Sequence, residues 1–338
     1  PGLAVAEYLR QQGWRIAWLG NPHGMEARLL SGRDYEMAWV DFSAVRGKGI
    51  LRKLLLPLNL LRGMFGAWRA ITRIRPDVVL GMGGYITFPG GVVAVLRGIP
   101  LVLHHQNSVA GLANRVLAKI AKRVLCGFPD ALPRGAWVGN PVREDIAVLP
   151  APTFRYPRHD GRLRVLVVGG SLGAQALNDV VPQAWGAMAA DARPEIVHQS
   201  GEKHLPALQA AYAAVGVQAH CVAFIEDMAG AYDWADLVIC RAGALTVAEL
   251  AAAGVASVLV PYPHAVDDHQ TANARFLAQA GAAILLPQSE LTAERLATIP
   301  TVPRSQWLEM AEKARELARP QATAEVAAVC ATLARGRQ

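Results

Sequence analysis

Hydrophobic and polar positions follow one repeating pattern along most of the chain. Short apolar runs, for example at residues 77–82, 100–104, 163–168 and 237–240, each lead into a polar or glycine-containing turn and then into a segment of helical composition. A strand followed by a returning helix is the unit of a parallel sheet. The pattern pauses at the prolines of 150–157 and then restarts, so the sequence predicts an α/β chain with two doubly wound parallel sheets.

The first elements depart from this pattern. Residues 1–12 predict a helix and residues 14–20 a strand, so the sequence opens on a helix with no strand before it. In an α/β domain such a helix normally connects two strands. We therefore expect a first strand and its loop to belong before Pro1.

The stretch 236–254 has a feature that ordinary connections lack. An apolar strand leads through a small-residue turn at 241–243 into an alanine-rich helix. Backbone N–H groups at a helix N-terminus, together with the helix dipole, attract anions. Glu249 adds a carboxylate further along the helix. A diphosphate beside a sugar would use both features, but on this stretch alone a structural turn with a solvated Glu249 is the simpler explanation.

Residues 78–96 carry no charge and are numerous enough to cross a bilayer. They also contain Pro89 and five glycines. Because these residues interrupt a helix, we predict a buried strand, a glycine turn and a helix after Pro89, and not a transmembrane segment.

Residues 42–76 contain eight arginine and lysine residues and no acidic one. Apolar residues recur at helical spacing, although Pro57, Gly63 and Gly66 should kink or divide the helix. Such a basic amphipathic surface suits an anionic membrane. A helix packed on the sheet, with solvated arginines, fits the pattern equally well. The candidate membrane-facing residues are Lys53, Leu54, Leu58, Phe65 and Trp68.

Composition narrows the class of protein. Hydrophobic residues are 52% of the 338 residues and charged residues 18%, which is typical of a globular chain with room for two domains. The net charge of +7 favours acidic partners such as phosphorylated ligands or anionic lipid. The four cysteines are scattered without metal-binding spacing, which predicts buried free thiols and no metal site.

Two other classes of protein fit less well. The loop at 169–174 reads GGSLGA and not GxGxxG, and the next predicted strand ends without the acid that a dehydrogenase uses to bind adenosine ribose. Aromatic residues are 7% and do not interleave with basic ones as a base-stacking surface. The sequence therefore argues against a nicotinamide enzyme and against nucleic-acid binding.

Several motifs, in their order and spacing, closely resemble the MurG family. In the second half they are GGSLGA at 169–174, FIEDM at 224–228, CRAGALTVAEL at 240–250 and PYPHAVDDHQTANA at 261–274. The first half adds GMGGY at 81–85, LHHQN at 103–107 and GNPVR at 139–143. The resemblance spans nearly the whole chain.

The resemblance implies a GT-B fold and an inverting transfer of N-acetylglucosamine (GlcNAc). The donor would be UDP-GlcNAc, and the acceptor the 4-hydroxyl of MurNAc in undecaprenyl-diphospho-MurNAc-pentapeptide, a step of peptidoglycan synthesis. It also implies a membrane-associated acceptor domain at 1–143, a donor domain at 144–319 and a C-terminal helix at 320–338 that returns to the first domain. The third implied partner is an anionic membrane surface, at the cytoplasmic face of the bacterial inner membrane.

The resemblance assigns site residues by position. Ser171 and Arg143 match donor-phosphate contacts, and Glu249 matches the acceptor of the ribose hydroxyls. The full set implied for UDP-GlcNAc is Asn107, Arg143, Ser171, Ile225, Ala244, Leu245, Thr246, Val247, Ala248, Glu249 and Gln270. Asn114, Asn178 and Arg241 match other polar positions of the cleft between the two domains.

This chemistry needs neither a metal nor a cofactor. Departure of UDP places negative charge on the diphosphate, which helix N-termini and Arg143 can stabilise. The pair Asp267 and Asp268 does not directly follow a strand, as a metal-binding acidic pair would. We expect this pair to position the helix that carries Gln270.

The acceptor hydroxyl needs a base. The family's usual histidine lies in a glycine-rich loop that would precede Pro1, so the candidates in this chain are Tyr85, His104 and His105. His105 stands where the family has glutamate, either as a base or as a changed cleft residue. A UDP-GlcNAc 2-epimerase of the same fold, and a non-catalytic remnant that binds nucleotide or membrane, remain alternatives.

Overall fold

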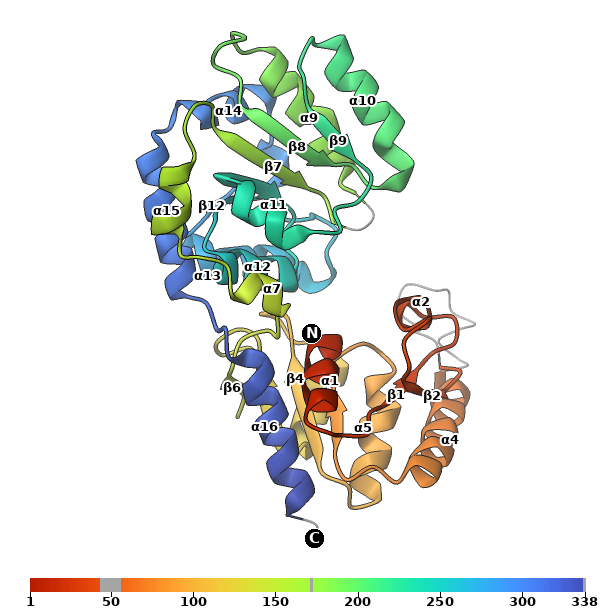
Figure 1. The fold of residues 1–338 in the computed structure, drawn as a ribbon. Coiled ribbons are helices and arrows are strands. Elements are labelled where there is room, and N and C mark those ends of the chain that lie inside the picture. The colour runs from red at the N-terminus through yellow and green to blue at the C-terminus, as the bar shows by residue number, and fades with distance from the viewer. Residues whose placement is uncertain (43–55, 171–172, 337–338) are drawn as a thin grey trace. The chain divides into compact units, whose positions relative to one another are not determined.

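The structure, a computed structural model, describes residues 1–42, 56–170 and 173–336 (Figure 1). Three candidate site residues, Lys53, Leu54 and Ser171, lie outside these ranges. The chain divides into two compact units. The first comprises Pro1–Pro141 and Gln321–Gln338, and the second comprises Val142–Pro320.

The second unit is built on one parallel sheet of six strands, in the order β12-β11-β10-β7-β8-β9. The chain builds from β7 towards one edge and then returns beside β7 to build towards the other, so the order reverses between β7 and β10. The strands are β7 (Arg164–Val168), β8 (Glu195–Gln199), β9 (His220–Val222), β10 (Leu237–Cys240), β11 (Ala256–Leu259) and β12 (Ile284–Leu285). Such a reversal, at the carboxyl ends of the strands, is where doubly wound sheets bind ligands.

Helices connect these strands. They are α7 (Glu144–Ala147), α8 (Pro152–Arg155), α9 (Gln175–Gly186), α10 (Leu205–Ala214), α11 (Met228–Trp234), α12 (Ala244–Ala253), α13 (His269–Ala278), α14 (Ala293–Ala297) and α15 (Arg304–Glu316). All four residues of β10 and of β11 are buried, as expected for central strands whose two faces are covered. Gly254 ends α12 in the left-handed conformation, which is the usual glycine stop.

The first unit has parallel strands in two groups, β1-β2 and β3-β4-β5-β6. The strands are β1 (Ala17–Gly20), β2 (Glu36–Trp39), β3 (Val79–Gly81), β4 (Leu101–His105), β5 (Arg123–Cys126) and β6 (Ala136–Trp137). The helices are α1 (Gly2–Gln11), α2 (Met25–Leu29), α4 (Leu56–Ile74), α5 (Thr87–Leu96), α6 (Leu112–Ile120) and α16 (Ala322–Arg335). Val5 and Leu9 of α1 share one apolar core with Val326 and Cys330 of α16.

The predicted α/β class, with parallel strands in both halves, is confirmed. Residues 78–96 form strand β3, a glycine turn and helix α5, as predicted, but α5 begins at Thr87, two residues before Pro89. Within the described ranges, no helix combines the length and apolar character needed to span a bilayer.

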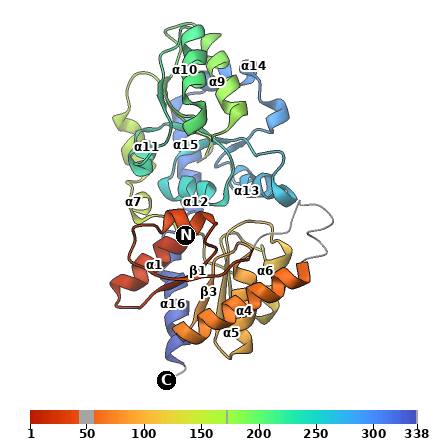
Figure 2. The ribbon, with the colours of Figure 1, turned by 90° about the vertical axis from the view of Figure 1, so that its right-hand side faces the viewer.

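The prediction that α4 is divided is wrong, because a single helix runs from Leu56 to Ile74. Pro57 is the second described residue of the helix. Gly63 and Gly66 allow a close approach to the chain that follows β2. An added Cβ would lie 2.7 Å from Cδ2 of Phe42 at Gly63, and 3.0 Å from Cγ1 of Val40 at Gly66. Figure 2 shows α4 lying alongside α5.

Candidate functional site

In the second unit the turns after β7 and β10 flank the reversal of strand order. The turn after β7 depends on its glycines, since Gly170 and Gly173 have φ of 84° and 78°. A Cβ on Gly173 would lie 1.8 Å from the carbonyl oxygen of Ser200, so no other residue fits. Gln199, at the end of β8, donates its side-chain N–H to the carbonyl of Gly170 at 3.0 Å. The glycine turn is thus held against the neighbouring strand end.

The turn after β10 presents the N-terminus of α12. Gly243 is the N-cap, and it has no side chain that could cap the first turn of the helix. The buried Asn273 of α13 donates to the carbonyl of Ala242 at 3.1 Å and fixes the turn. The predicted elements of the stretch 236–254 are therefore all present. Ala244 and Val247 are buried, while Leu245, Thr246 and Ala248 are partly exposed.

Glu249 lies in the middle of α12 with specific partners. Its Oε2 accepts a hydrogen bond of 3.2 Å from the hydroxyl of Tyr232 on α11. Burial raises the pKa of Glu249, and the positive charge of Arg143 and the Tyr232 hydrogen bond act in the opposite direction. Arg143 is exposed, directly before α7. The structure therefore brings together, within one unit, the two charged residues that the sequence assigns to the diphosphate and the ribose.

Two other predicted residues support loops at this edge. Oε1 of Gln270 accepts from the backbone N–H of Tyr262 at 2.9 Å. The guanidinium of Arg241 donates to Oε1 of Gln288 at 2.6 Å and to the carbonyl of Val260 at 3.1 Å. Arg241 therefore braces the ends of two neighbouring strands. Ile225 lies partly exposed just after β9.

The acidic pair before α13 has the expected position. Asp267 and Asp268 both have positive φ, 56° and 50°, at the start of the helix that carries Gln270. Oδ1 of Asp268 accepts from the hydroxyl of Thr271 at 2.6 Å. Asp268 therefore helps to define how α13 begins.

Asn178 is a core residue and not an exposed polar position. Its side chain is buried, donates to the carbonyl of Ser200 at 3.2 Å and pairs with Nε2 of His198 at 3.1 Å. Burial lowers the pKa of His198 to about 3, so this imidazole is neutral. Because Gly173 abuts the same Ser200 carbonyl, Asn178 supports the glycine turn from behind.

In the first unit, His104 is fully buried at the end of β4. Its Nε2 donates to the carbonyl of Gly139 at 2.9 Å, and its Nδ1 accepts from the side chain of Gln106 at 3.1 Å. Burial lowers its pKa to about 4. With both ring nitrogens bonded, His104 joins two loops and is poorly suited to accept a substrate proton.

His105, the next residue, has a different environment. Asn114 of α6 contacts its Nδ1 at 2.8 Å. Its Nε2 is buried and meets hydrogen-bond geometry with no described residue. Burial lowers the pKa of His105 as well, so the ring is neutral near pH 7. Asn107 follows directly, in the loop between β4 and α6.

Tyr85, after β3, lies in a polar cluster that sequence reasoning missed. Burial raises the pKa of Tyr85, the charge of Glu26 raises it further, and a hydrogen bond with Asn21 lowers it. The backbone N–H of Asn21 donates to Oε1 of Glu26 at 2.7 Å, and its side chain donates to the carbonyl of Phe42 at 2.6 Å. Asn21 and Glu26 follow β1 without a recognisable motif. The one signal in the sequence that could have identified them is their position after the end of a strand.

Metal ligands are a separate question. Within residues 1–42, 56–170 and 173–336, no three His, Cys, Asp or Glu side chains are grouped so that they could hold a metal ion. All four cysteines are free thiols, and three of them, Cys126, Cys240 and Cys330, are buried.

Two Rossmann-like parallel units, one with a glycine turn and an acid-bearing helix at its strand reversal, are the architecture of the GT-B fold. Residues 1–126 match the glycosyltransferase family 28 N-terminal domain, and residues 164–326 match its C-terminal domain. The chain belongs to glycosyltransferase family 28 and, within it, to the MurG family.

Two similar proteins carry the name of one activity. A protein of Dechloromonas aromatica (strain RCB) is 66% identical over 335 residues, which cover 99% of this chain and 95% of the relative. It is called UDP-N-acetylglucosamine--N-acetylmuramyl-(pentapeptide) pyrophosphoryl-undecaprenol N-acetylglucosamine transferase. A protein of Azoarcus sp. (strain BH72) with the same name is 65% identical over 339 residues, which cover 100% of this chain and 95% of that relative.

Solved structures agree on the fold. The crystal structure of Acinetobacter baumannii MurG is 45% identical, has a TM-score of 0.86 and covers 98% of this chain and 95% of its own. A putative UDP-N-acetylglucosamine 2-epimerase from Listeria monocytogenes has a TM-score of 0.61 at 14% identity, covering 99% and 92% of the two chains. At that identity the likeness concerns the fold alone.

Proposed function

We propose that the chain transfers GlcNAc from UDP-GlcNAc to the 4-hydroxyl of MurNAc in undecaprenyl-diphospho-MurNAc-pentapeptide, with inversion at the anomeric carbon. Relatives at 66% and 65% identity over nearly the whole chain carry the name of this activity, which favours it over the epimerase and over a non-catalytic remnant. The structural observation that supports it best is Glu249, partly buried on α12 and within the electrostatic reach of Arg143.

The residues of the second unit suit a sugar nucleotide. In this proposal Arg143 and the N-terminus of α12 stabilise the diphosphate as its negative charge grows, so no metal is needed. Glu249 accepts from the ribose hydroxyls, since its Oε1 is not used by Tyr232. The backbone of Ile225 binds the uracil, and Gln270 forms hydrogen bonds with the hydroxyls of the sugar.

On the acceptor side, His105 is the base candidate to test first. It is neutral near pH 7, and its Nε2 can accept a proton when the ring carries its own proton on Nδ1 and donates it to the side-chain oxygen of Asn114, whereas both nitrogens of His104 are bonded. We expect His105→Ala to lose most of its kcat. His105→Glu, which restores the family's residue, should keep it. Equal rates for His105→Ala and the unchanged chain would remove His105 as the base.

Product analysis tests the proposed reaction. The chain is incubated with labelled UDP-GlcNAc, with and without the lipid-linked MurNAc-pentapeptide acceptor. A labelled disaccharide-lipid that forms only with acceptor supports the transferase. UDP together with an isomerised sugar in the absence of acceptor means an epimerase, and donor that is bound but unchanged means a remnant. Glu249→Ala should raise the donor KM in the same assay, and wild-type donor binding in that variant would remove the Glu249 assignment.

We further propose that the first unit contacts an anionic membrane, at the cytoplasmic face of the bacterial inner membrane. On α4, the side chains of Leu58, Leu61, Phe65 and Trp68 are 57%, 67%, 64% and 45% exposed. The guanidinium of Arg97 lies 4.9 Å from the ring centre of Trp68, so a basic side chain borders this apolar row. Exposed large apolar side chains beside basic ones are typical of an interfacial surface.

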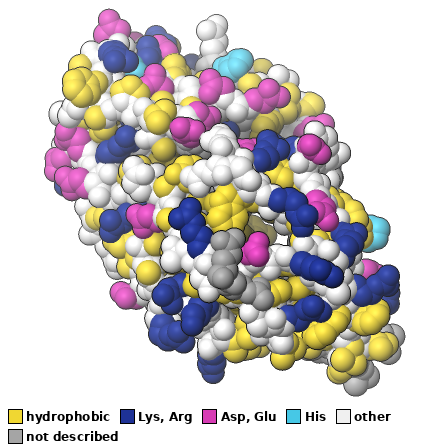
Figure 3. Space-filling model, turned by 60° about the horizontal axis from the view of Figure 1, so that its bottom comes forward, with side chains coloured by type: hydrophobic (Ala, Val, Ile, Leu, Met, Phe, Trp, Pro, Cys, Tyr) yellow, Lys and Arg dark blue, Asp and Glu magenta, His cyan; other side chains and the backbone are white. Residues whose placement is uncertain are grey.

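A second exposed row continues this surface on α6. Leu112, Val116 and Ile120, four residues apart, are 71%, 38% and 40% exposed. Helix α5 packs against both α4 and α6 and exposes Leu96, so the exposed apolar residues lie on neighbouring helices. Figure 3 views the molecule from below and shows Lys and Arg side chains gathered among hydrophobic ones over the first unit. Each basic residue near an anionic surface adds about 1 kcal/mol.

Liposome flotation tests this surface. The variant Leu58→Ser/Phe65→Ser/Trp68→Ser should bind phosphatidylglycerol vesicles about thirtyfold more weakly, since partial burial of three such side chains is worth about 2 kcal/mol. The matched control is Val148→Ser/Phe154→Ser, which removes two residues of the second unit that are 70% and 67% exposed. Equal loss in both variants, or unfolding of the first, would contradict the proposal.

A further inference from the structure

We propose that Tyr232 is a positioning residue for donor recognition, because it holds Glu249 in the orientation that favours ribose over 2′-deoxyribose nucleotides. This inference rests on the proposed role of Glu249. Tyr232 lies on α11, outside the motif that carries Glu249, and its side chain is 1% exposed, so it does not itself meet the ligand.

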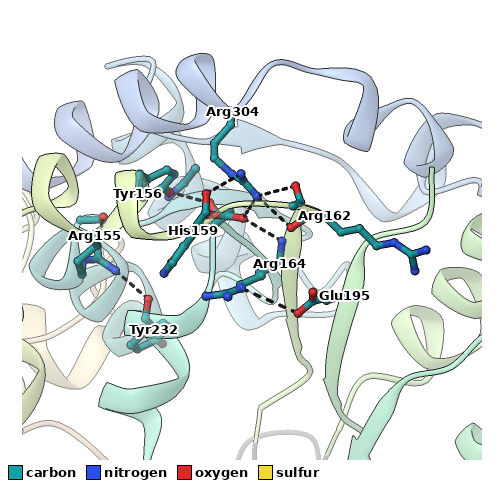
Figure 4. A network of polar contacts seen from close by, with 12 residues as sticks. Arg155, Tyr156, His159, Arg162, Arg164, Glu195, Tyr232 and Arg304 are labelled. Carbon is teal, nitrogen blue, oxygen red and sulfur yellow. Dashed lines mark hydrogen bonds and ion pairs between the residues drawn. The ribbon is translucent and has the colours of Figure 1, made fainter. Parts of the chain in front are cut away.

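The two ends of Tyr232 are fixed by different contacts. Its hydroxyl donates to Oε2 of Glu249 at 3.2 Å. Its backbone carbonyl accepts a hydrogen bond of 2.8 Å from Nη1 of Arg155, which Figure 4 shows at close range. With the backbone and the hydroxyl both held, the ring has little freedom to move, and the position of the hydroxyl is set by the core of the second unit.

Arg155 also fixes the helix that carries Glu249. The side chain of Arg155 is 1% exposed, and its Nη2 donates to the carbonyl of Ala253 at 2.7 Å and to the carbonyl of Gly254. These carbonyls lie at the C-terminal end of α12, where the helix dipole favours a cation. Arg155 and Tyr232 thus join α11 to α12 at two points, one at the end of α12 and one at Glu249.

This arrangement gives each carboxylate oxygen of Glu249 a separate task. Oε2 faces Tyr232, and Oε1 remains for a hydroxyl of the ligand. Without the Tyr232 hydroxyl the side chain can turn about its terminal bond, since that rotation is soft. A ligand with two ribose hydroxyls loses affinity when this orientation is lost. A ligand that lacks the 2′-hydroxyl loses less affinity, because it makes fewer hydrogen bonds to Glu249.

The test compares Tyr232→Phe with Tyr156→Phe. Tyr156 is also buried in the second unit, and its hydroxyl donates to the backbone carbonyl of Asp236 at 2.6 Å and not to Glu249. Calorimetry gives the Kd of each variant for UDP-GlcNAc and for its 2′-deoxy analogue, and turnover with lipid acceptor gives kcat. Urea unfolding measures how far each variant is destabilised.

For Tyr232→Phe we expect about a tenfold rise in the Kd for UDP-GlcNAc, the loss typical of a hydrogen bond to a charged group. The Kd for the 2′-deoxy analogue and the kcat at saturating donor should stay close to wild type. Tyr156→Phe should keep the wild-type ratio of the two Kd values, however much the substitution destabilises the protein. The double variant Tyr232→Phe/Glu249→Ala should bind no more weakly than Glu249→Ala.

The outcomes separate this inference from the role it rests on. If Glu249→Ala keeps the wild-type ratio of Kd values, the ribose assignment of Glu249 fails, and the inference about Tyr232 fails with it. If Glu249→Ala loses the ratio but Tyr232→Phe retains it, only the positioning role is refuted. An equal rise of both Kd values in Tyr232→Phe and Tyr156→Phe would mean a general effect on the core.

Discussion

Asp236 is the centre of a buried polar network whose removal should destabilise the second unit without changing the donor site. Its side chain is fully buried and directly precedes β10. Oδ1 lies 2.8 Å from Nδ1 of His159, and Oδ2 accepts from the backbone N–H of Arg164 at 2.9 Å and from Nη2 of Arg304 at 3.0 Å. Figure 4 shows the labelled members of this network.

We expect Asp236→Asn to lower the free energy of unfolding by about 3 kcal/mol. Breaking a buried ion pair by removing one partner costs about 3–5 kcal/mol, and the lower end applies because the Arg304 side chain is 27% exposed and keeps some hydration. An amide also offers one acceptor oxygen where the carboxylate offers two. For a unit of this size, the loss corresponds to a Tm lower by about 6–12 °C.

Differential scanning calorimetry, with a donor titration at low temperature, checks this prediction. The matched control is Glu195→Gln: Glu195 lies 3.9 Å from Arg164 but is 52% exposed, so its loss should cost less than about 0.5 kcal/mol. The Kd for UDP-GlcNAc should not change in either variant, since both positions lie at the amino ends of the strands. A melting temperature for Asp236→Asn equal to that of the control would refute the reasoning.

Three further predictions concern the glycine turn, pH and the thiols. Gly173→Ala should abolish donor binding, because its Cβ would overlap the Ser200 carbonyl. The control Gly161→Ala is also at positive φ but lies in open space, so it should cost only about 1 kcal/mol of stability and keep donor binding. Calorimetry measures both effects. Burial raises the pKa of Glu249, and protonation removes the acceptor of the ribose hydroxyls. As the pH is lowered, donor affinity should therefore begin to fall at a higher pH than an exposed glutamate would cause. Glu249→Gln should flatten this part of a plot of Kd against pH. Burial raises the pKa of Cys240 to about 12, so this thiol should react with a chromogenic disulfide reagent only after unfolding, and reaction in the native chain would contradict its burial.

The fold was predictable wherever one local pattern decided the structure. Strands β7 and β10 are short apolar runs because helices cover both of their faces, and the turns after them need small residues. The continuity of α4 was not predictable in the same way. The effect of Gly63 depends on Phe42, which lies 21 positions away in the sequence, and helical periodicity carries no information about such a partner.

The site shows the same limit. Glu249 was predictable because its motif fixes its place on one helix, but Tyr232 was not, since it lies 17 residues earlier on a different helix. Asn178 follows a glycine turn, as a ligand contact would, yet its side chain faces inward to His198. Glu26 has no motif, and the fold alone brings it near Tyr85.

The glycines on the inner side of α4 separate selection on how the helix packs from selection on its exposed side chains. Contact with Phe42 and Val40 is made through backbone that has no side chain to vary, so the docking of the helix does not depend on the residues of its outer row. That row can then change without loss of this contact. The same separation offers a practical route to a more water-compatible protein for crystallisation, in which the outer row is replaced and the core is left as it is.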